Sequence, residues 1–176
     1  EFKKIAPALQ KKGFDGSKIY LVDGNLANYS DQSWAGYLEG AKGTLPGGAL
    51  DEAFKQRAAD LYMTNHGTEL KEFAYLAESY DAVILLALAA QQAGNDSGEA
   101  IKDNMQSVSS GGEVVTNFKD GLAAIKAGKD IDYNGYSGPI EFDDNGDPTG
   151  ASIGIYQYGT DGTNTLLEVV AGNSVE

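Results

Sequence analysis

The stretch YLAESYDAVILLALA at residues 75–89 gives the clearest indication of how this chain folds. Its apolar side chains recur at the three- and four-residue spacing of a helix, starting from Phe73. Val83, Leu85 and Leu86 add apolar groups on the remaining sides, which is typical of a helix with a buried middle. Gly94 is placed to end it. The stretch therefore predicts a long core helix.

The residues before this helix predict an α/β unit. Residues 2–12 have helical apolar spacing, with Gly13 as the stop and a regular part that begins near Pro7, where a first-turn proline is tolerated. Residues 18–22, KIYLV, are nearly all apolar, as expected of a buried parallel strand, and Asp23-Gly24-Asn25 form a loop. Asp31 is a candidate cap for a short helix over 31–38. The Gly- and Pro-rich residues 43–48 predict a connector.

The residues around and after the core helix predict further helices and then strands. Apolar stripes favour helices over residues 50–66, 101–108 and 118–127, with Gly67 and Gly128 as stops. The pattern then changes to the alternation of strands over residues 139–142, 151–158 and 165–170. Asn145-Gly146 and Asp161-Gly162 are the predicted turns.

Composition and charge exclude several classes of function. The chain has 176 residues, no Cys and a net charge of −13, so thiolate sites are absent and binding to nucleic acid or to an anionic membrane surface is disfavoured. The charge is uneven. Residues 1–44 carry six basic and five acidic side chains, whereas residues 45–155 carry seven and eighteen. This step indicates two surfaces with different surroundings.

Tests for enzymatic, nucleotide and metal sites find no specific motif. His66 is the single histidine and is expected to be a solvated last-turn residue. The glycines do not match the spacings of phosphate-binding loops. Residues 143–147, DDNGD, resemble a calcium loop superficially but lack its ligand spacing and closing Glu. Hydrolysis by a carboxylate pair remains an alternative, although no pair stands out. We expect no catalytic residue, no metal and no cofactor.

Asp23 is the candidate binding residue that the pattern itself selects. It follows a predicted buried strand directly, and ligands of open α/β sheets bind beyond the carboxyl ends of strands. A carboxylate there can bind a ligand ammonium group through charge-assisted hydrogen bonds. The alternative is that Asp23 only bonds a nearby loop amide in an Asx-turn.

Several segments resemble the branched-chain amino-acid (Leu/Ile/Val) group of ABC-transporter substrate-binding proteins. The most specific is GKDIDYNGYSGPIEFDDNGDP at residues 128–148, and the helix at 75–89 is moderately specific. KIYLVDG at 18–24, LEGAKGTLP at 38–46 and the helix at 54–67 add weaker similarity in the family's order. The resemblance implies an α/β, type I periplasmic-binding-protein fold. This fold has two α/β lobes with crossovers, and the chain resembles a C-terminal fragment containing parts of both.

By this resemblance, residues 1–44 are part of the C-terminal lobe and residues 45–155 part of the N-terminal lobe. Residues 156–176 then form a crossover and a return strand. The family often places an acidic residue that holds the ligand's ammonium group where Asp23 lies, with Gly24 beside it. Ala77 falls where some members present an aromatic ring, and Glu78 and Tyr80 are neighbours that could substitute. Tyr80 also fits the core stripe, so a purely structural role stays open.

The resemblance implies the extracytoplasmic solute-binding component of an ABC importer, either periplasmic or a cell-surface lipoprotein. Its expected ligand is a branched-chain or similar small amino acid, bound in an interlobe cleft, and its partners are a permease and ATPase subunits. A sensory or regulatory ligand-binding domain of the same fold is the alternative. The fragment alone is expected to form homo-oligomers or exchange strands, because exposed strand edges pair readily.

Overall fold

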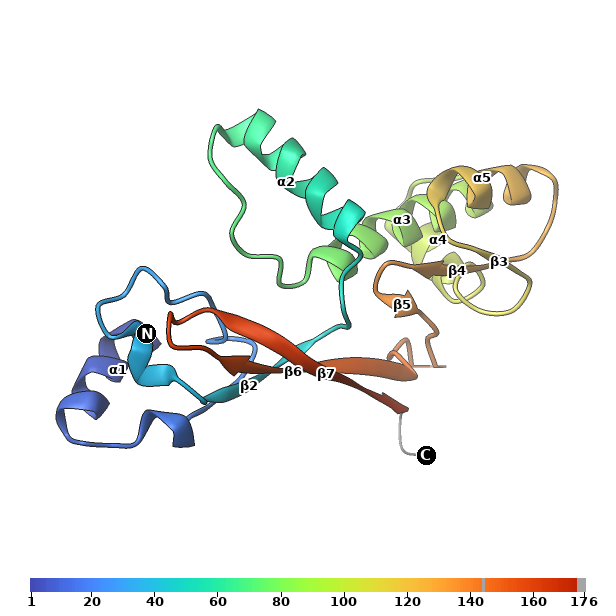
Figure 1. Cartoon of the computed structure of the whole chain (residues 1–176). Helices are drawn as coiled ribbons and strands as arrows, with labels where there is room; N and C mark the ends of the chain where they lie inside the picture. The colour runs from blue at the N-terminus through green and yellow to red at the C-terminus, as the bar shows by residue number, and fades with distance from the viewer. Residues whose placement is uncertain (144, 174–176) are drawn as a thin grey trace. The chain divides into compact units, whose positions relative to one another are not determined.

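The computed structural model describes residues 1–143 and 145–173 of the chain (Figure 1). They form two compact units. Unit 1 consists of residues 1–74 and 152–170, and unit 2 of the described residues within 75–151 and 171–173. The lobe boundaries predicted at residues 44 and 155 refer to a complete two-lobed protein and stay predictions.

Unit 1 is a four-stranded sheet with helices. The strands stand in the order β1-β2-β6-β7, with β1 parallel to β2 and β2 antiparallel to β6. Its elements are α1 (Phe2–Lys11), the 3-10 helix η1 (Gly16–Lys18), β1 (Tyr20–Leu21), the 3-10 helix η2 (Ala35–Leu38), β2 (Lys42–Pro46), α2 (Glu52–His66), β6 (Gly150–Tyr158) and β7 (Asn164–Asn173). Two strands therefore come from the first fifty residues and two from the end of the chain.

The predicted connector at residues 43–48 is wrong over most of its length, because β2 occupies it. Thr44 lies opposite Ile155 of β6, and Gly43 lies opposite Leu21 of β1. Glycine is required at position 43 by crowding, since a Cβ atom there would lie 2.7 Å from the Leu26 side chain. The glycine that suggested a loop is a close-packing position inside a strand.

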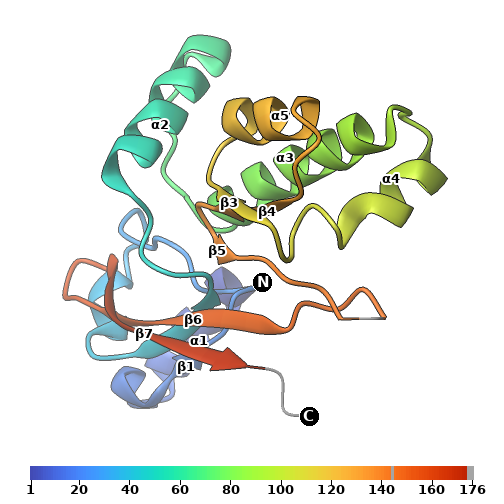
Figure 2. The same cartoon turned by 90° about the vertical axis from the view of Figure 1, so that its right-hand side faces the viewer.

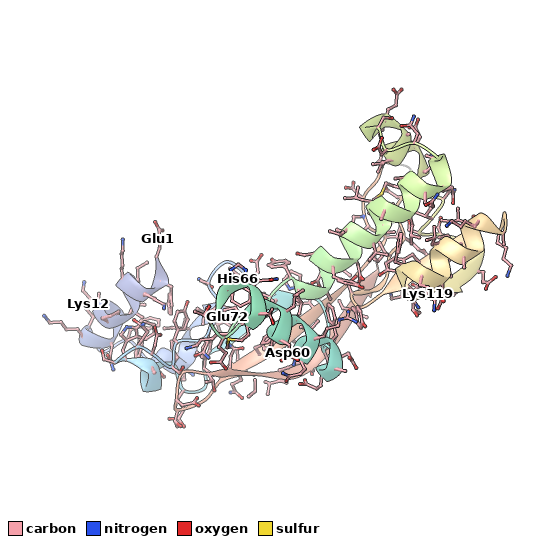
Figure 3. All side chains as sticks on the ribbon, turned by 90° about the horizontal axis from the view of Figure 1, so that it is seen from above. Glu1, Lys12, Asp60, His66, Glu72 and Lys119 are labelled. Atoms are coloured by element: carbon pink, nitrogen blue, oxygen red, sulfur yellow. The ribbon has the colours of Figure 1, made fainter. Side chains whose placement is uncertain are left out.

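The N-terminal elements are present with altered bounds. α1 runs through Pro7, so it begins before the position that the proline rule favours. Glu1 and Lys12 flank its two ends (Figure 3). β1 is shorter than the predicted strand at 18–22, because η1 occupies its start. The short helix predicted at 31–38 is reduced to the 3-10 helix η2, whose N-cap position is Trp34 and not Asp31, and no side chain caps it.

Aromatic rings fill the core of unit 1. Tyr29 lies 5.3 Å from Trp34, 5.5 Å from Phe2 and 6.0 Å from Tyr158 between ring centroids. Such pairs add to the free energy gained from apolar burial. One ring comes from α1, two come from the loop that follows β1, and one comes from β6. They therefore join segments that lie far apart in the sequence.

Unit 2 consists of three helices and a small sheet (Figure 2). Its strands stand in the order β3-β4-β5, with β3 parallel and β5 antiparallel to β4. The elements are α3 (Leu76–Ala93), α4 (Gly98–Met105), β3 (Glu113–Val115), α5 (Phe118–Lys126), β4 (Ile131–Gly135) and β5 (Gly138–Pro139). α3 packs against both other helices and against β4.

The four later predicted helices and the two long tail strands are confirmed. α2 and α3 end at Gly67 and Gly94, which both adopt the left-handed conformation expected of a C-cap. α4 and α5 match the third and fourth predicted helices, and β6 and β7 match the two long tail strands. The strand predicted at 139–142 is reduced to β5, and β3 and β4 have no counterpart in the sequence prediction. No helix of the described residues is long and apolar enough to cross a membrane.

Replacing Leu88 with alanine is expected to lower the free energy of unfolding by about 2–5 kcal/mol, because Leu88 is fully buried among α3, α5 and β3 residues. Leu86→Ala is the matched control on the same helix, and its 45% exposure predicts a loss of about 0.5 kcal/mol. Urea denaturation of the two variants measures the difference. Equal losses would contradict the placement of Leu88 in the core.

A second prediction concerns alkaline pH. Burial raises the pKa of the Tyr158 hydroxyl to about 12, above the ordinary value of 10.0. The stability that this neutral hydroxyl contributes is therefore complete below pH 10 and is lost as the pH rises toward 12. Tyr158→Phe is expected to be less stable at neutral pH and to show a shallower alkaline loss in urea denaturation at stepped pH. An unchanged slope would contradict this.

Candidate functional site

Asp23 and Gly24 lie at the tip of a hydrogen-bonded turn that follows β1. The Asn25 amide donates to the Val22 carbonyl at 2.8 Å, and the Val22 amide donates to the Asn25 side-chain oxygen, also at 2.8 Å. β1 is parallel to β2, so the turn leaves the carboxyl end of a parallel pair. Both tip residues are exposed. Asp23 therefore lies beyond a strand's carboxyl end as predicted, but that strand is not buried as expected, since Tyr20 is 78% exposed.

The loop after this turn is anchored to distant parts of unit 1. The Tyr158 hydroxyl donates to the Ala27 carbonyl at 2.7 Å and accepts from the Ala27 amide at 3.2 Å. The Asn28 amide donates to the Glu72 carboxylate at 2.9 Å. The Tyr29 hydroxyl donates to the Asn25 carbonyl at 2.6 Å. These bonds hold the backbone that carries Asp23 in a defined position.

The other candidate residues lie in the first two turns of α3, in unit 2. Ala77 is buried, whereas Glu78 and Tyr80 are half-buried. Glu78 is in the first turn, where a negative charge interacts favourably with the helix dipole. The helix is preceded by Tyr75, whose φ of 59° makes it the one non-glycine residue with positive φ among those described. Asp23 and these α3 residues therefore belong to different units.

Tyr80 has an aromatic neighbour that sequence reasoning missed. The ring of Tyr136 meets it edge-on, with centroids 5.6 Å apart and planes at 71°. Tyr136 lies in the turn between β4 and β5 and is 38% exposed. The two residues are 56 positions apart, and no local spacing connects them. The pair gives unit 2 an accessible aromatic surface at the start of α3.

The second missed residue is Asp81, which is 1% exposed inside unit 2. Its Oδ1 accepts from the Tyr133 hydroxyl at 2.8 Å and from the Tyr136 amide at 3.2 Å. Its Oδ2 accepts from both the amide and the hydroxyl of Ser137 at 2.6 Å. The sequence did contain one signal. Asp81 lies four residues from each of the buried residues Ala77 and Leu85, so a charged residue stands where the apolar stripe of the helix requires a core residue.

Two further features define the surroundings of Asp81. Burial, with the bond to the Asp81 carboxylate as a second cause, raises the pKa of the Tyr133 hydroxyl well above its usual range. Tyr133 is itself fully buried, so it links the carboxylate to the core. Gly135 lies so close that an added Cβ atom would overlap the Asp81 carboxyl group. The helix and the β4–β5 turn thus meet at their closest approach around this group.

His66 and Asp143, which were considered for acid–base chemistry and metal binding, lie at the end of a helix and in a turn. The ring of His66, in the last turn of α2, lies 4.3 Å from that of Tyr62 (Figure 3). Asp143 accepts the amides of Asp147 at 2.9 Å and Asn145 at 2.8 Å, and these bonds lower the pKa of its carboxyl group. The amide of Gly146 also bonds the Asp143 carbonyl at 2.9 Å, as expected of the predicted turn. Residues 1–143 and 145–173 contain no group of three or more side chains suited to a metal ion.

Gly135→Ala is expected to reduce the free energy of unfolding by about 1–3 kcal/mol, because the new methyl group must displace Asp81 or the turn. Gly98→Ala is the control, since nothing lies within 4 Å of that position and α4 favours alanine over glycine. Urea denaturation compares the two. A Gly135→Ala protein as stable as the control would contradict the close approach described here.

Comparison with known proteins identifies the family. Residues 38–161 match the family described as the receptor family ligand binding region, which is more than half of the chain. The chain matches no curated protein sequence. Among solved structures it is similar to the leucine binding protein LivK of Thermotoga maritima, with 24% identity and a TM-score of 0.60 over 96% of this chain.

A second similar structure is LivJ, the branched-chain amino acid transporter substrate binding protein of Streptococcus pneumoniae, solved in complex with isoleucine. It is 20% identical, with a TM-score of 0.59 over 98% of this chain. The chain spans 41% of the length of each of these proteins. Together with the mixed α/β units, these matches confirm the predicted fold class. The chain belongs to the receptor family ligand binding region family and has the type I periplasmic-binding-protein fold.

Proposed function

We propose that this chain is part of a solute-binding protein that binds a branched-chain amino acid, or a similar small amino acid, between the two lobes of the complete fold. The observation that carries the proposal is the exposed Asp23 on a fixed turn beyond a parallel strand pair. Ligands of α/β sheets bind at such positions. LivK and LivJ, which share the fold, are named for leucine and branched-chain amino acids.

The ammonium group of the ligand is assigned to Asp23, with Gly24 beside it. A carboxylate on an anchored backbone binds an ammonium group more strongly than one on a mobile loop, because the backbone needs no further ordering on binding. The bonds from Tyr158 to Ala27 and from Asn28 to Glu72 supply that anchoring.

The side chain of the ligand is assigned to the start of α3. Tyr80 and its neighbour Tyr136 offer an aromatic surface for apolar groups, and Glu78 lies at its edge. Ala77 is buried in the first turn of α3 and cannot supply the aromatic ring that some members of the family present there, so Tyr80 takes that role in the proposal. Small-molecule sites usually combine a few polar groups with an apolar wall.

No chemical change of the ligand is part of this function. The protein would deliver the amino acid to the permease of an ABC importer, whose ATPase subunits supply the energy, and would act outside the cytoplasm, as a periplasmic or lipid-anchored protein. Lobe closure around the ligand is the motion that such delivery requires.

The test is calorimetric titration of the full-length protein with L-leucine and L-isoleucine. Asp23→Ala is expected to weaken binding by about 10–100-fold, the value of a lost charge-assisted hydrogen bond in a desolvated site. Asp31→Ala is the matched control in the same unit. Its exposed side chain pairs only weakly with Lys3, at 3.6 Å, so its affinity is expected to be unchanged.

Two results would overturn the proposal. Failure of the unmodified protein to bind either amino acid would reject the ligand class. Binding by Asp23→Ala at the affinity of the unmodified protein would reject the role of Asp23 while leaving the ligand class in place.

A further inference from the structure

We propose that Asp81 is a positioning residue for the ligand site. It fixes the β4–β5 turn in the conformation that places the ring of Tyr136 against Tyr80. The inference rests on the proposed function in one respect only, that the Tyr80–Tyr136 surface receives the ligand. The control of Tyr136 by Asp81 is a property of unit 2 itself.

The first argument is the cost of burying this carboxylate. Asp81 is 1% exposed, and the ion pairs found among the described residues do not include it. A buried charge without a cation is tolerated only when hydrogen bonds replace its hydration. Four donors do so here. An apolar residue would fill the same helix position without that requirement, so the carboxylate does more than pack.

The second argument is where the donors lie. Three of the four come from the turn, namely the backbone amides of Tyr136 and Ser137 and the hydroxyl of Ser137. Two successive amides that bond to one carboxylate fix the backbone torsion angles between them. They therefore set the direction in which the Tyr136 side chain leaves the backbone.

The third argument is the link back to α3. Asp81 holds the backbone of Tyr136, and the adjacent helix residue Tyr80 contacts its ring at 5.6 Å. Two adjacent residues of α3 thus hold Tyr136, one at its backbone and one at its ring. The ring is 38% exposed, and its contact with Tyr80 restricts its side-chain conformations. Ordering it before the ligand arrives removes an entropy cost from binding.

Tyr133 provides a control within the same network. Its hydroxyl bonds Oδ1 from the core side, and its removal leaves all three turn-side donors in place. Tyr133→Phe therefore tests the loss of a buried hydrogen bond without release of the turn. Asp81→Asn keeps the shape of the side chain but replaces one acceptor oxygen with a donor, which opposes a turn amide.

The first experiment needs no ligand. Hydrogen exchange and side-chain NMR are measured on the full-length protein carrying Asp81→Asn, Ser137→Ala or Tyr133→Phe. In Asp81→Asn the amide of Ser137 is expected to exchange about tenfold faster or more, with shifted ring signals of Tyr80 and Tyr136. Ser137→Ala is expected to show a smaller change of the same kind, and Tyr133→Phe neither effect.

The outcome that overturns the proposal is equally specific. If Tyr133→Phe changes the turn amides and the two ring signals as much as Asp81→Asn does, Asp81 acts only as a general core group. Ser137→Ala keeps the test decisive if Asp81→Asn does not fold, because it removes a turn-side bond and leaves the carboxylate in place. Unchanged ring signals in Ser137→Ala under that circumstance reject the proposal.

The second experiment measures binding in a double-mutant cycle with L-leucine. When Tyr136 is present, Asp81→Asn is expected to weaken binding about five- to tenfold. In a Tyr136→Ala background it is expected to leave binding unchanged, because no ring remains to be positioned. The loss of thermal stability persists in both backgrounds, because Tyr136→Ala retains the backbone amide. Equal losses of affinity in both backgrounds would contradict positioning through Tyr136.

The two proposals can fail separately. If the unmodified protein does not bind L-leucine, the proposed function fails, while the ligand-free signals still decide whether Asp81 holds Tyr136.

Discussion

The position of the loop after β1 depends on one tyrosine hydroxyl at the end of β6. Tyr158, at the end of β6, bonds both backbone groups of Ala27, a residue 131 positions earlier. Its ring also stacks on Tyr29, so the same side chain closes the aromatic core. Local bonds alone would not hold β1, which has two residues. The turn that presents Asp23 therefore obtains its rigidity from the last quarter of the sequence.

In unit 2, a buried carboxylate holds the β4–β5 turn in place. A short three-stranded sheet lies against α3 and α5. The Asp81 carboxylate joins α3 to the last turn of this sheet by accepting hydrogen bonds from the turn. Such a network is directional, whereas apolar packing is not. The turn is thereby held in one orientation, and Gly135 is the position that permits the approach.

The elements that sequence reasoning predicted are those whose signals are local. α2, α3 and α5 have apolar stripes with glycine stops, and a stripe requires no knowledge of its partner. β2 was missed because its strand state comes from pairing with β1 and β6, and its Gly43 and Pro46 argue for a loop when considered alone. β3 and β4 were missed for the same reason. Short strands are defined by their neighbours more than by their own residues.

The candidate site divides in the same way. Asp23 was found because its position relative to a strand can be predicted from adjacent residues. Asp81 and Tyr136 act through contacts between segments 55 residues apart, which a single sequence does not show. Family resemblance directed attention to α3 but selected Ala77, Glu78 and Tyr80, residues on the same turn as Asp81. Their contact with ligand stays a prediction.

Tyr75 has a consequence for the energy of the backbone where the two units divide. A side chain in the left-handed region costs the folded state about 1–2 kcal/mol, a cost that glycine avoids. Such a torsion angle persists only where the surrounding structure holds it, so the contacts around Tyr75 offset about 1–2 kcal/mol of backbone strain at the start of α3.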